Sequence, residues 1–379
     1  MTLPIHRLHR IAVSIFFFCC GCIFATWASR IPSIKDKFHF NEASLGAVLF
    51  MLPFGSLVAL PFAGWSVARF GSRTMTFLSA VLYAVLLVML GYTDNVTALA
   101  TVLFFFGFWG DVLNIAVNTQ ALQVQEEHYS KPLMSSFHGM WSLGALSGAF
   151  FGGLFMKAKW EMMSQFLFVA IVITLMVVFF FFYLIPKDAT KHKSQKLFAW
   201  PDKALWLLGA ICFCCALCEG AMADWSSLYY KQVLNDMDRV STTGYTAFAF
   251  LMAFGRLIGD RLTERLGYKG ILMLDSILIS GGLALAIGIQ HPVIVIIGFG
   301  LVGFGVATII PIVYSLAART KTMAPSTALA AVSTVGFSGF LFGPPVIGFV
   351  AHAISLRWAL GLVLLLGLVI LFLGKRVRA

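Results

Sequence analysis

Charged residues are scarce in this chain: Asp, Glu, Lys and Arg make up 11% of its 379 residues, and only 16 residues are acidic. Soluble globular domains carry about 25% charged residues, so the composition excludes an ordinary soluble protein. Long polar regions are lacking too, the longest being residues 186–203. This disfavours a sensor or scaffold with a large soluble domain, and the expected surroundings are lipid.

Cysteine is confined to two short segments. The seven cysteines are Cys19, Cys20, Cys22, Cys212, Cys214, Cys215 and Cys218. Neighbouring cysteines on one helix point in different directions, so a disulfide framework is not implied. A thiolate site for a soft metal between the two segments is one interpretation. The more common role is that of a small apolar packing residue, so no metal and no cofactor are expected.

Apolar residues dominate, with 60% hydrophobic residues and 37 phenylalanines. An apolar run of about 18 residues or more can cross a bilayer as a helix. Twelve such runs occur, at residues 11–28, 44–66, 74–91, 96–122, 133–156, 164–185, 204–224, 243–260, 270–289, 292–316, 327–350 and 356–374. The sequence predicts an all-α polytopic membrane protein with two six-helix bundles, residues 1–185 and 204–379, joined by a linker at 186–203.

The basic residues predict the orientation. With the N-terminus inside, the inside segments hold most of the 27 Lys and Arg, which places both termini in the cytoplasm. Five of these residues lie in the linker, namely Lys187, Lys191, Lys193, Lys196 and Lys203. The net charge of +11 therefore needs no nucleic-acid partner. An alternative for the start of the chain is a signal peptide cleaved after Ala28, but residues 11–28 complete an even number of spans and favour a retained helix.

A short basic turn occurs twice, at residues 68–73 and, 196 residues later, at 264–269. Each copy follows the second apolar run of its half, which indicates tandem duplication, a frequent plan among transporters. We expect these turns to take part in gating. The candidates are Gly64, Arg69, Gly71, Arg73, Asp260, Arg261, Arg265 and Gly267.

Three acidic residues fall clearly within spans: Asp111, Glu219 and Asp275. A carboxylate at the centre of a membrane helix costs about 2.5–3.5 kcal/mol on insertion scales, so it is expected to face protein or water. Asp275 lies near the inner end of its span, where it can be solvated, and is expected to be structural. Asp111 and Glu219 are the candidates for proton coupling. The alternative is a carboxylate permanently ionised against a cation such as Arg30 or Arg256.

Asp111, Asn114 and Asn118 form a polar stripe on one predicted helix. Their spacing places them within an arc of about 60°. Unsatisfied polar groups in hydrocarbon cost several kcal/mol each, so the stripe must face something polar. One interpretation is interhelical hydrogen bonding, worth about 0.6 kcal/mol per contact. The other is a substrate cavity, to which Trp27 and Trp225 would add stacking surfaces.

Arg30 is open to two interpretations, attraction of an anionic substrate group or anchoring at the membrane interface.

Several other motifs carry less information about function. Residues 298–303 match the glycine pattern of dinucleotide-binding loops but lie within an apolar run without a preceding strand. The spacing of Gly144, Gly148 and Gly152 instead predicts close helix packing. No His, Asp and Glu cluster suggests an enzyme.

The twelve-span plan and the pattern Gly64-x3-Ala68-Arg69-x-Gly71-Ser72-Arg73 resemble the major facilitator superfamily, whose pattern has Asp where this chain has Ala68. Residues 27–32, 111–118, 135–144 and 219–226 more narrowly resemble its YbjJ-type bacterial inner-membrane branch, which is similar to the fucose permeases. In those permeases an acidic residue of the fourth helix takes part in proton-coupled sugar uptake, and Asp111 resembles it. Their acidic residue on the first helix has no counterpart in residues 11–28.

Together, residues and resemblance predict a secondary active transporter in the bacterial inner membrane, working by alternating access. The expected partners are the lipid bilayer, a small polar solute such as a sugar or sugar derivative, and protons. The chain is expected to act as a monomer. Two alternatives are an exporter of drugs or metabolites with the same fold, and a membrane sensor or scaffold without transport activity.

Overall fold

The computed structural model describes residues 4–129, 133–186, 203–233, 241–320 and 325–377, and the secondary structure within them is helical. The expected linker at 186–203 lies outside the described residues apart from its two ends.

The chain divides into two compact units. The first takes in the described residues between Met1 and His39 and between Met51 and His192, and the second those between Phe40 and Phe50 and between Lys193 and Ala379. The first unit contains α1 (Ile5–Ser29), α2 (Ile31–Lys37), α4 (Met51–Phe70), α5 (Ser72–Tyr92), α6 (Val96–His128), α7 (Met134–Lys157) and α8 (Met162–Phe181). The second contains α3 (Glu42–Leu49), α9 (Lys203–Val233), α10 (Thr243–Gly288), α11 (Pro292–Val306), α12 (Ile309–Ala318), α13 (Pro325–Ala353) and α14 (Leu356–Gly374).

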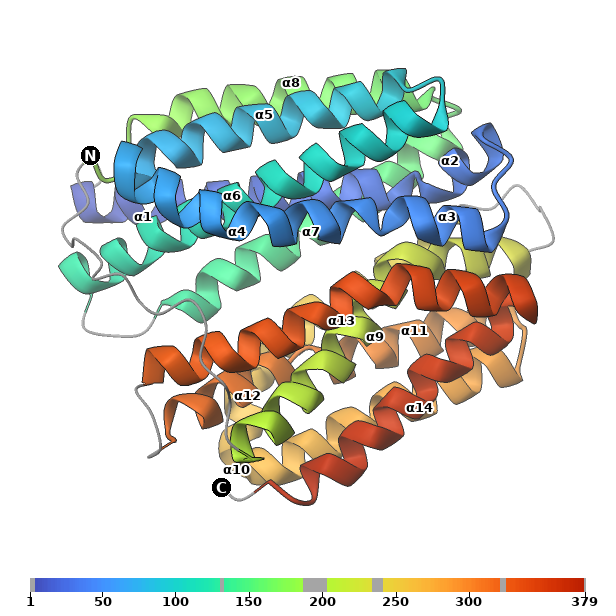
Figure 1. Ribbon diagram of the computed structural model, residues 1–379. Helices are drawn as coiled ribbons and strands as arrows, with labels where there is room; N and C mark the ends of the chain where they lie inside the picture. Colours follow the sequence, from blue (N-terminus) through green and yellow to red (C-terminus); the bar gives the residue numbers. More distant parts are fainter. Residues whose placement is uncertain (1–3, 130–132, 187–202, 234–240, 321–324, 378–379) are drawn as a thin grey trace. The chain divides into compact units, whose positions relative to one another are not determined.

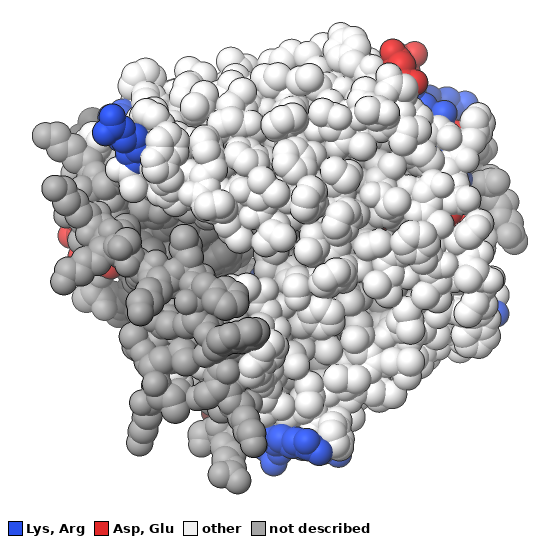
Figure 2. All heavy atoms as spheres, viewed as in Figure 1, with Lys and Arg blue, Asp and Glu red and all other residues white. Residues whose placement is uncertain are grey.

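Eleven helical segments in the described part of the chain are long and apolar enough to cross a membrane. Each of the twelve expected apolar runs falls on a helix or on two consecutive helices, the run 243–260 forming the first part of α10. Large apolar side chains such as Phe151, Phe179 and Phe182 are exposed. Figure 2 shows a face whose described surface is nearly free of charged residues, which gather at its margins. The all-helical polytopic architecture is confirmed.

Within the first unit, α1 lies along α7, α4 lies along α6, and α5 contacts both α6 and α8 (Figure 1). Glycines make the first of these contacts close. A Cβ on Gly144 would lie 2.0 Å from the Phe18 carbonyl oxygen, and one on Gly148 2.5 Å from that of Cys22. A Cβ on Gly152 would lie 2.3 Å from Ser29 Oγ. The predicted close packing at this glycine spacing is confirmed.

Within the second unit, α10 lies along α11 and α14, and α13 contacts both α9 and α3. The contact between α13 and α3 is also made through glycines, because a Cβ on Gly46 would lie 2.5 Å from the Pro344 carbonyl oxygen. A Cβ on Gly348 would lie 2.6 Å from the Glu42 carbonyl oxygen. Backbones in both units therefore approach to distances that a larger residue would prevent.

The two basic turns share an unusual backbone conformation. Gly71 separates α4 from α5 with φ 85° and ψ 147°, and Gly267 kinks α10 with φ 70° and ψ 164°. In this region of φ a side chain is strained, so glycine is the residue that fits. The repeat seen in the sequence is thus a repeat of backbone geometry.

Candidate functional site

The polar stripe of the first unit lies on the middle of α6. The Asn118 amide donates to Asn114 Oδ1 over 2.9 Å and to the Asn114 carbonyl oxygen over 2.7 Å. Asp111 is within hydrogen-bonding reach of the Asn114 side chain. The stripe is therefore a connected set of polar groups, with Asn114 exposed and Asp111 buried at 9% relative exposure.

Asp111 faces the interior of the first unit. Its Oδ2 atom is buried and has no hydrogen-bond partner among the described residues. The carboxyl group lies close enough to Cys20 of α1 for an electrostatic interaction, and Cys20 in turn contacts Trp141 of α7. Asp111 is thus held where α1 and α6 meet, with one oxygen available to a proton or another donor.

Trp27 and Arg30, at the end of α1, are both buried. The Trp27 ring lies 6.4 Å from that of Phe106 on α6. Arg30 Nε donates to Gln165 Oε1 over 2.6 Å, and its Nη2 donates to the Trp160 carbonyl oxygen over 2.8 Å. The Arg30 guanidinium therefore ties α1 to the start of α8, a partner set that the sequence did not reveal.

In the second unit, Glu219 of α9 pairs with Arg256 of α10. The distance from Arg256 Nη2 to Glu219 Oε1 is 3.3 Å, with side-chain exposures of 18% and 12%. Tyr245 lies close enough to interact electrostatically with both. The ion pair thus joins the helices that carry the two charges.

Trp225 follows this pair by less than two turns of α9 and is fully buried. Its indole Nε1 and the hydroxyl groups of Ser226 and Ser227 are buried without a hydrogen-bond partner among the described residues. Buried polar atoms are rarely left unpaired in folded proteins. This end of α9 therefore carries donors that a polar ligand or water could satisfy.

The basic turns differ in how their side chains are held. Gly64, Arg69, Arg261 and Arg265 are exposed. Arg73 is half-buried, with its guanidinium carbon 4.5 Å from the centre of the Phe181 ring. The side chain of Asp260 lies outside the described residues.

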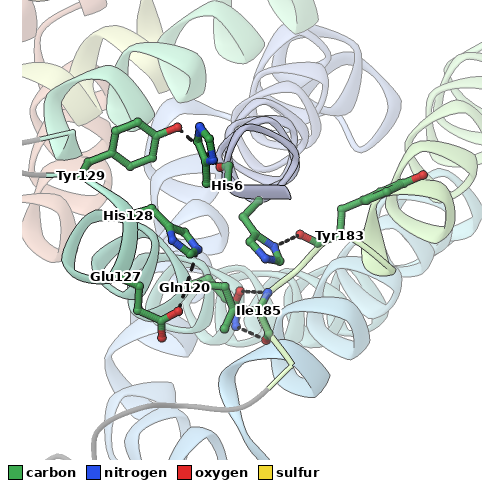
Figure 3. Close-up of polar contacts among 8 residues, drawn as sticks. His6, Gln120, Glu127, His128, Tyr129, Tyr183 and Ile185 are labelled. Atoms are coloured by element: carbon green, nitrogen blue, oxygen red, sulfur yellow. Dashed lines mark hydrogen bonds and ion pairs between the residues drawn. The ribbon is translucent and has the colours of Figure 1, made fainter. Parts of the chain in front are cut away.

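One end of the first unit carries polar contacts that the sequence analysis missed. Gln120 donates to the Ile185 carbonyl oxygen over 3.1 Å and accepts from Ile185 N over 2.9 Å (Figure 3). It also donates to Ser72 Oγ over 2.6 Å. Nearby, His9 Nδ1 lies 2.8 Å from the Tyr183 carbonyl oxygen and the His9 ring stacks on His128. A glutamine within a predicted membrane-spanning run was the available sequence signal for this cluster.

The environment of Asp275 differs from the one expected from the sequence. Asp275 was expected to be solvated near the inner end of its span, but it is fully buried. It accepts a hydrogen bond from Thr308 Oγ1. No group of three or more His, Cys, Asp or Glu residues within the described ranges could hold a metal ion.

Comparison with known proteins identifies the family. Residues 12–327 match the family model described as Major Facilitator Superfamily. The chain belongs to this superfamily. Membership makes it a secondary transporter and not an enzyme.

Two bacterial relatives match almost the whole of this major facilitator protein. An uncharacterised MFS-type transporter of Yersinia pestis is 32% identical over 357 residues, covering 94% of this chain and 92% of the relative. Membrane protein MosC of Rhizobium meliloti is 31% identical over 369 residues, covering 97% and 90%.

Among solved structures, a variant of the nucleoside transporter NupG has a TM-score of 0.81 at 14% identity, with 97% of this chain and 99% of that chain covered. This likeness shows the fold. The expected superfamily and fold are confirmed.

Proposed function

We propose that this transporter moves a small polar solute, with a sugar or sugar derivative as the first candidate, and that protons drive the transport. The observation that carries the proposal is the stripe of Asp111, Asn114 and Asn118 on α6. Three polar side chains on one helix face, one of them exposed, offer the donors and acceptors that hydroxyl groups of a solute require. An apolar cargo would leave the remaining donors and acceptors of the stripe unpaired, at about 1–3 kcal/mol for each one that it buries.

Asp111 is the first proposed coupling group. Its Oδ2 atom is buried without a partner, and an isolated buried charge is strongly unfavourable. A proton on Oδ2 removes that charge. Solute binding at Asn114 would alter the hydrogen bonds of Asp111, because the two side chains are in contact. The carboxyl group could thus exchange its proton in step with the solute.

Glu219 is the second proposed coupling group, and its environment differs. It is paired with Arg256, so loss of its charge would remove an anionic partner from that guanidinium. Trp27 and Trp225 are proposed to shape the binding region through their ring surfaces and Arg30 to attract an anionic group, while the two basic turns gate the pathway. The Arg30 role requires the solute to displace Gln165 and Trp160.

We further propose the inner membrane of a bacterium as its location, with both termini in the cytoplasm, because Lys and Arg are concentrated in the segments that this orientation places inside.

The narrower likeness to the YbjJ-type branch supports uptake of a sugar-like solute. The nucleoside carried by NupG contains a sugar, which adds nucleosides to the candidates. Export remains the main alternative, and the same experiment addresses it.

The test uses the purified full-length chain in liposomes, with a pH gradient imposed in either direction and a panel of radiolabelled sugars, amino sugars, nucleosides, organic acids and apolar drugs. We expect one solute class to accumulate against its gradient on the alkaline side. Accumulation of apolar drugs alone would contradict the proposed cargo. Absence of movement for the whole panel, with protein-free liposomes as the baseline, would contradict the transport of small polar solutes.

Asp111→Asn tests the coupling group. The variant should lose gradient-driven accumulation while it retains exchange of labelled for unlabelled solute. Asp94→Asn is the matched control because Asp94 is exposed and lies between α5 and α6. If Asp111→Asn accumulates solute as the wild type does, Asp111 is not the coupling residue.

A further inference from the structure

The helix pair α11 and α12 is one apolar run interrupted at Ala307 and Thr308. Pro311 provides a reason in the sequence, because proline has no N–H and its ring clashes with the carbonyl group four residues earlier, which is that of Ala307. The N–H group of Ala307 also departs from the α-helical pattern, because it donates to the carbonyl oxygen of Phe304, three residues back and not four. Irregular backbone within a membrane span is tolerated where protein buries it or where it lines a water-filled cavity.

Protein buries this break, and glycines bring the neighbours close. A Cβ on Gly255 would lie 2.8 Å from Ala307 Cβ, and one on Gly259 would lie 2.6 Å from Thr308 Cγ2. On the other side, Cys215 Sγ of α9 lies 3.7 Å from the Val306 carbonyl oxygen. The break is thus enclosed by α9 and by the first part of α10.

Asp275, on the second part of α10, reaches the same break. Thr308 Oγ1 donates to its Oδ2. Its Oδ1 atom is buried with no hydrogen-bond partner among the described residues, and the residue as a whole has 0% exposure. A buried carboxylate with one hydrogen bond and no neighbouring cation is unfavourable, so Oδ1 is a place for a proton.

Few charged or titratable groups of the described residues lie around Asp275. Cys215 is close enough to interact electrostatically with both Asp275 and Glu219. The charge of Glu219 is paired with Arg256. The α11 helix has no charged residue. None of the ion pairs among the described residues involves Asp275.

Two other basic side chains near the packed helices have contacts of their own. Arg319 donates to Tyr268. Lys375 and Arg376 follow the end of α14, and Arg376 lies over the Phe372 ring at 4.3 Å. Among the described residues, the carboxyl group of Asp275 therefore has the Thr308 hydroxyl group as its hydrogen-bond partner and the Cys215 thiol within electrostatic range.

We propose that Asp275 is a proton-binding site, with Thr308 as its positioning residue, and that binding and release of the proton reshape the break between α11 and α12. The inference rests on the proposed function in one respect, since this proton would be a coupling ion. Release leaves a buried charge that one hydroxyl group cannot satisfy, so the break must open to admit water or backbone donors. Proton release and movement of the helix are then a single event.

Infrared difference spectroscopy of the full-length chain in liposomes tests proton binding without any solute. One component of the carbonyl stretch of buried neutral acids should be present at low pH, disappear as the pH rises, and be missing from Asp275→Asn, while the component that comes from Asp111 remains. Asp94→Asn, which removes an exposed carboxyl group, should leave the band intact. A wild-type spectrum that matches that of Asp275→Asn at every pH, or a band that never responds to pH, would overturn the proposal.

Hydrogen exchange over residues 303–318 tests the link to the break. At alkaline pH the wild type should exchange several-fold faster there than Asp275→Asn, which keeps an acceptor for Thr308 and carries no charge. Thr308→Val should exchange faster than the wild type, and Thr308→Ser should restore the wild-type rate. Equal rates in wild type and Asp275→Asn would contradict the link. Because neither measurement depends on transport, a failed uptake panel would leave this result standing.

Discussion

Arg256 Nη2 lies 3.3 Å from Glu219 Oε1, and the pair joins α9 to α10 in the second unit. Both side chains are largely shielded, with exposures of 18% and 12%, so neutralising Glu219 removes an anionic partner from a shielded guanidinium. We predict that Glu219→Gln destabilises the chain by about 3 kcal/mol, as is typical when a buried pair is broken. The double variant Glu219→Gln with Arg256→Gln should recover much of this loss. Thermal unfolding in detergent measures the stability of both variants. If the two substitutions had additive effects on stability, Glu219 and Arg256 would not stabilise the chain as a pair.

The glycines of the two basic turns should be intolerant of a side chain. Gly71→Ala and Gly267→Ala should each destabilise the chain by about 1 kcal/mol or more, because φ is 85° and 70° at these positions. Gly281→Ala is the matched control, since Gly281 is in helix α10 and has no heavy atom within 4 Å of its added Cβ. Helix propensity predicts up to about 1 kcal/mol of stabilisation there. Equal effects at the three sites would refute the conformational argument.

Gln120 should be needed to hold Ile185. Gln120→Leu removes the acceptor of the Ile185 N–H and a donor to its carbonyl oxygen. Leaving buried backbone groups unpaired costs about 1–3 kcal/mol each. Hydrogen exchange of residues 181–186 should therefore accelerate by at least ten-fold. The nearby variant Gln123→Leu serves as the control for placing an apolar side chain on α6, and acceleration by both would point to a general loosening of the helix.

Arg30 should act as a structural tie between α1 and α8. Gln165→Ala removes the acceptor of Arg30 Nε, and a hydrogen bond to a charged group contributes about 1.5–3 kcal/mol. We expect a loss of stability in that range, measured by thermal unfolding. The control is Ser164→Ala, one residue earlier on α8. An unchanged unfolding temperature in Gln165→Ala would show that the bond contributes little.

The features that the sequence predicted best depend on local chain properties. Apolar length predicted the spans, and the spacing of Gly144, Gly148 and Gly152 predicted close packing, because both are set by the helix itself. The repeated turns were visible as a pair. Their shared positive φ explains why glycine stands at both Gly71 and Gly267.

The missed features depend on partners far away in the sequence. Arg30 and Gln165 are separated by 135 residues, so their pairing does not follow from a helical pattern. Pairing of a carboxylate with Arg256 was named as an alternative to proton coupling, but the 37 residues between Glu219 and Arg256 kept a helical pattern from deciding between the two. Asp275 was placed near the inner end of its span by counting residues, which says nothing about what packs against it. Pro311 is a feature of the sequence that indicates an interrupted helix. Asp275, which accepts a hydrogen bond from Thr308 at the interruption, lies on another helix.

The seven cysteines have a consequence for spectroscopy. All are free, six are buried, and Cys22 is half-buried within α1. Thiol reagents that label membrane transporters act on exposed thiolates, so the native chain should give little background. Single cysteines introduced into the exposed parts of the two basic turns could then be labelled selectively, without first replacing residues that pack the interiors of α1 and α9. The wild-type sequence is therefore a suitable background for attaching spectroscopic labels that report conformational change.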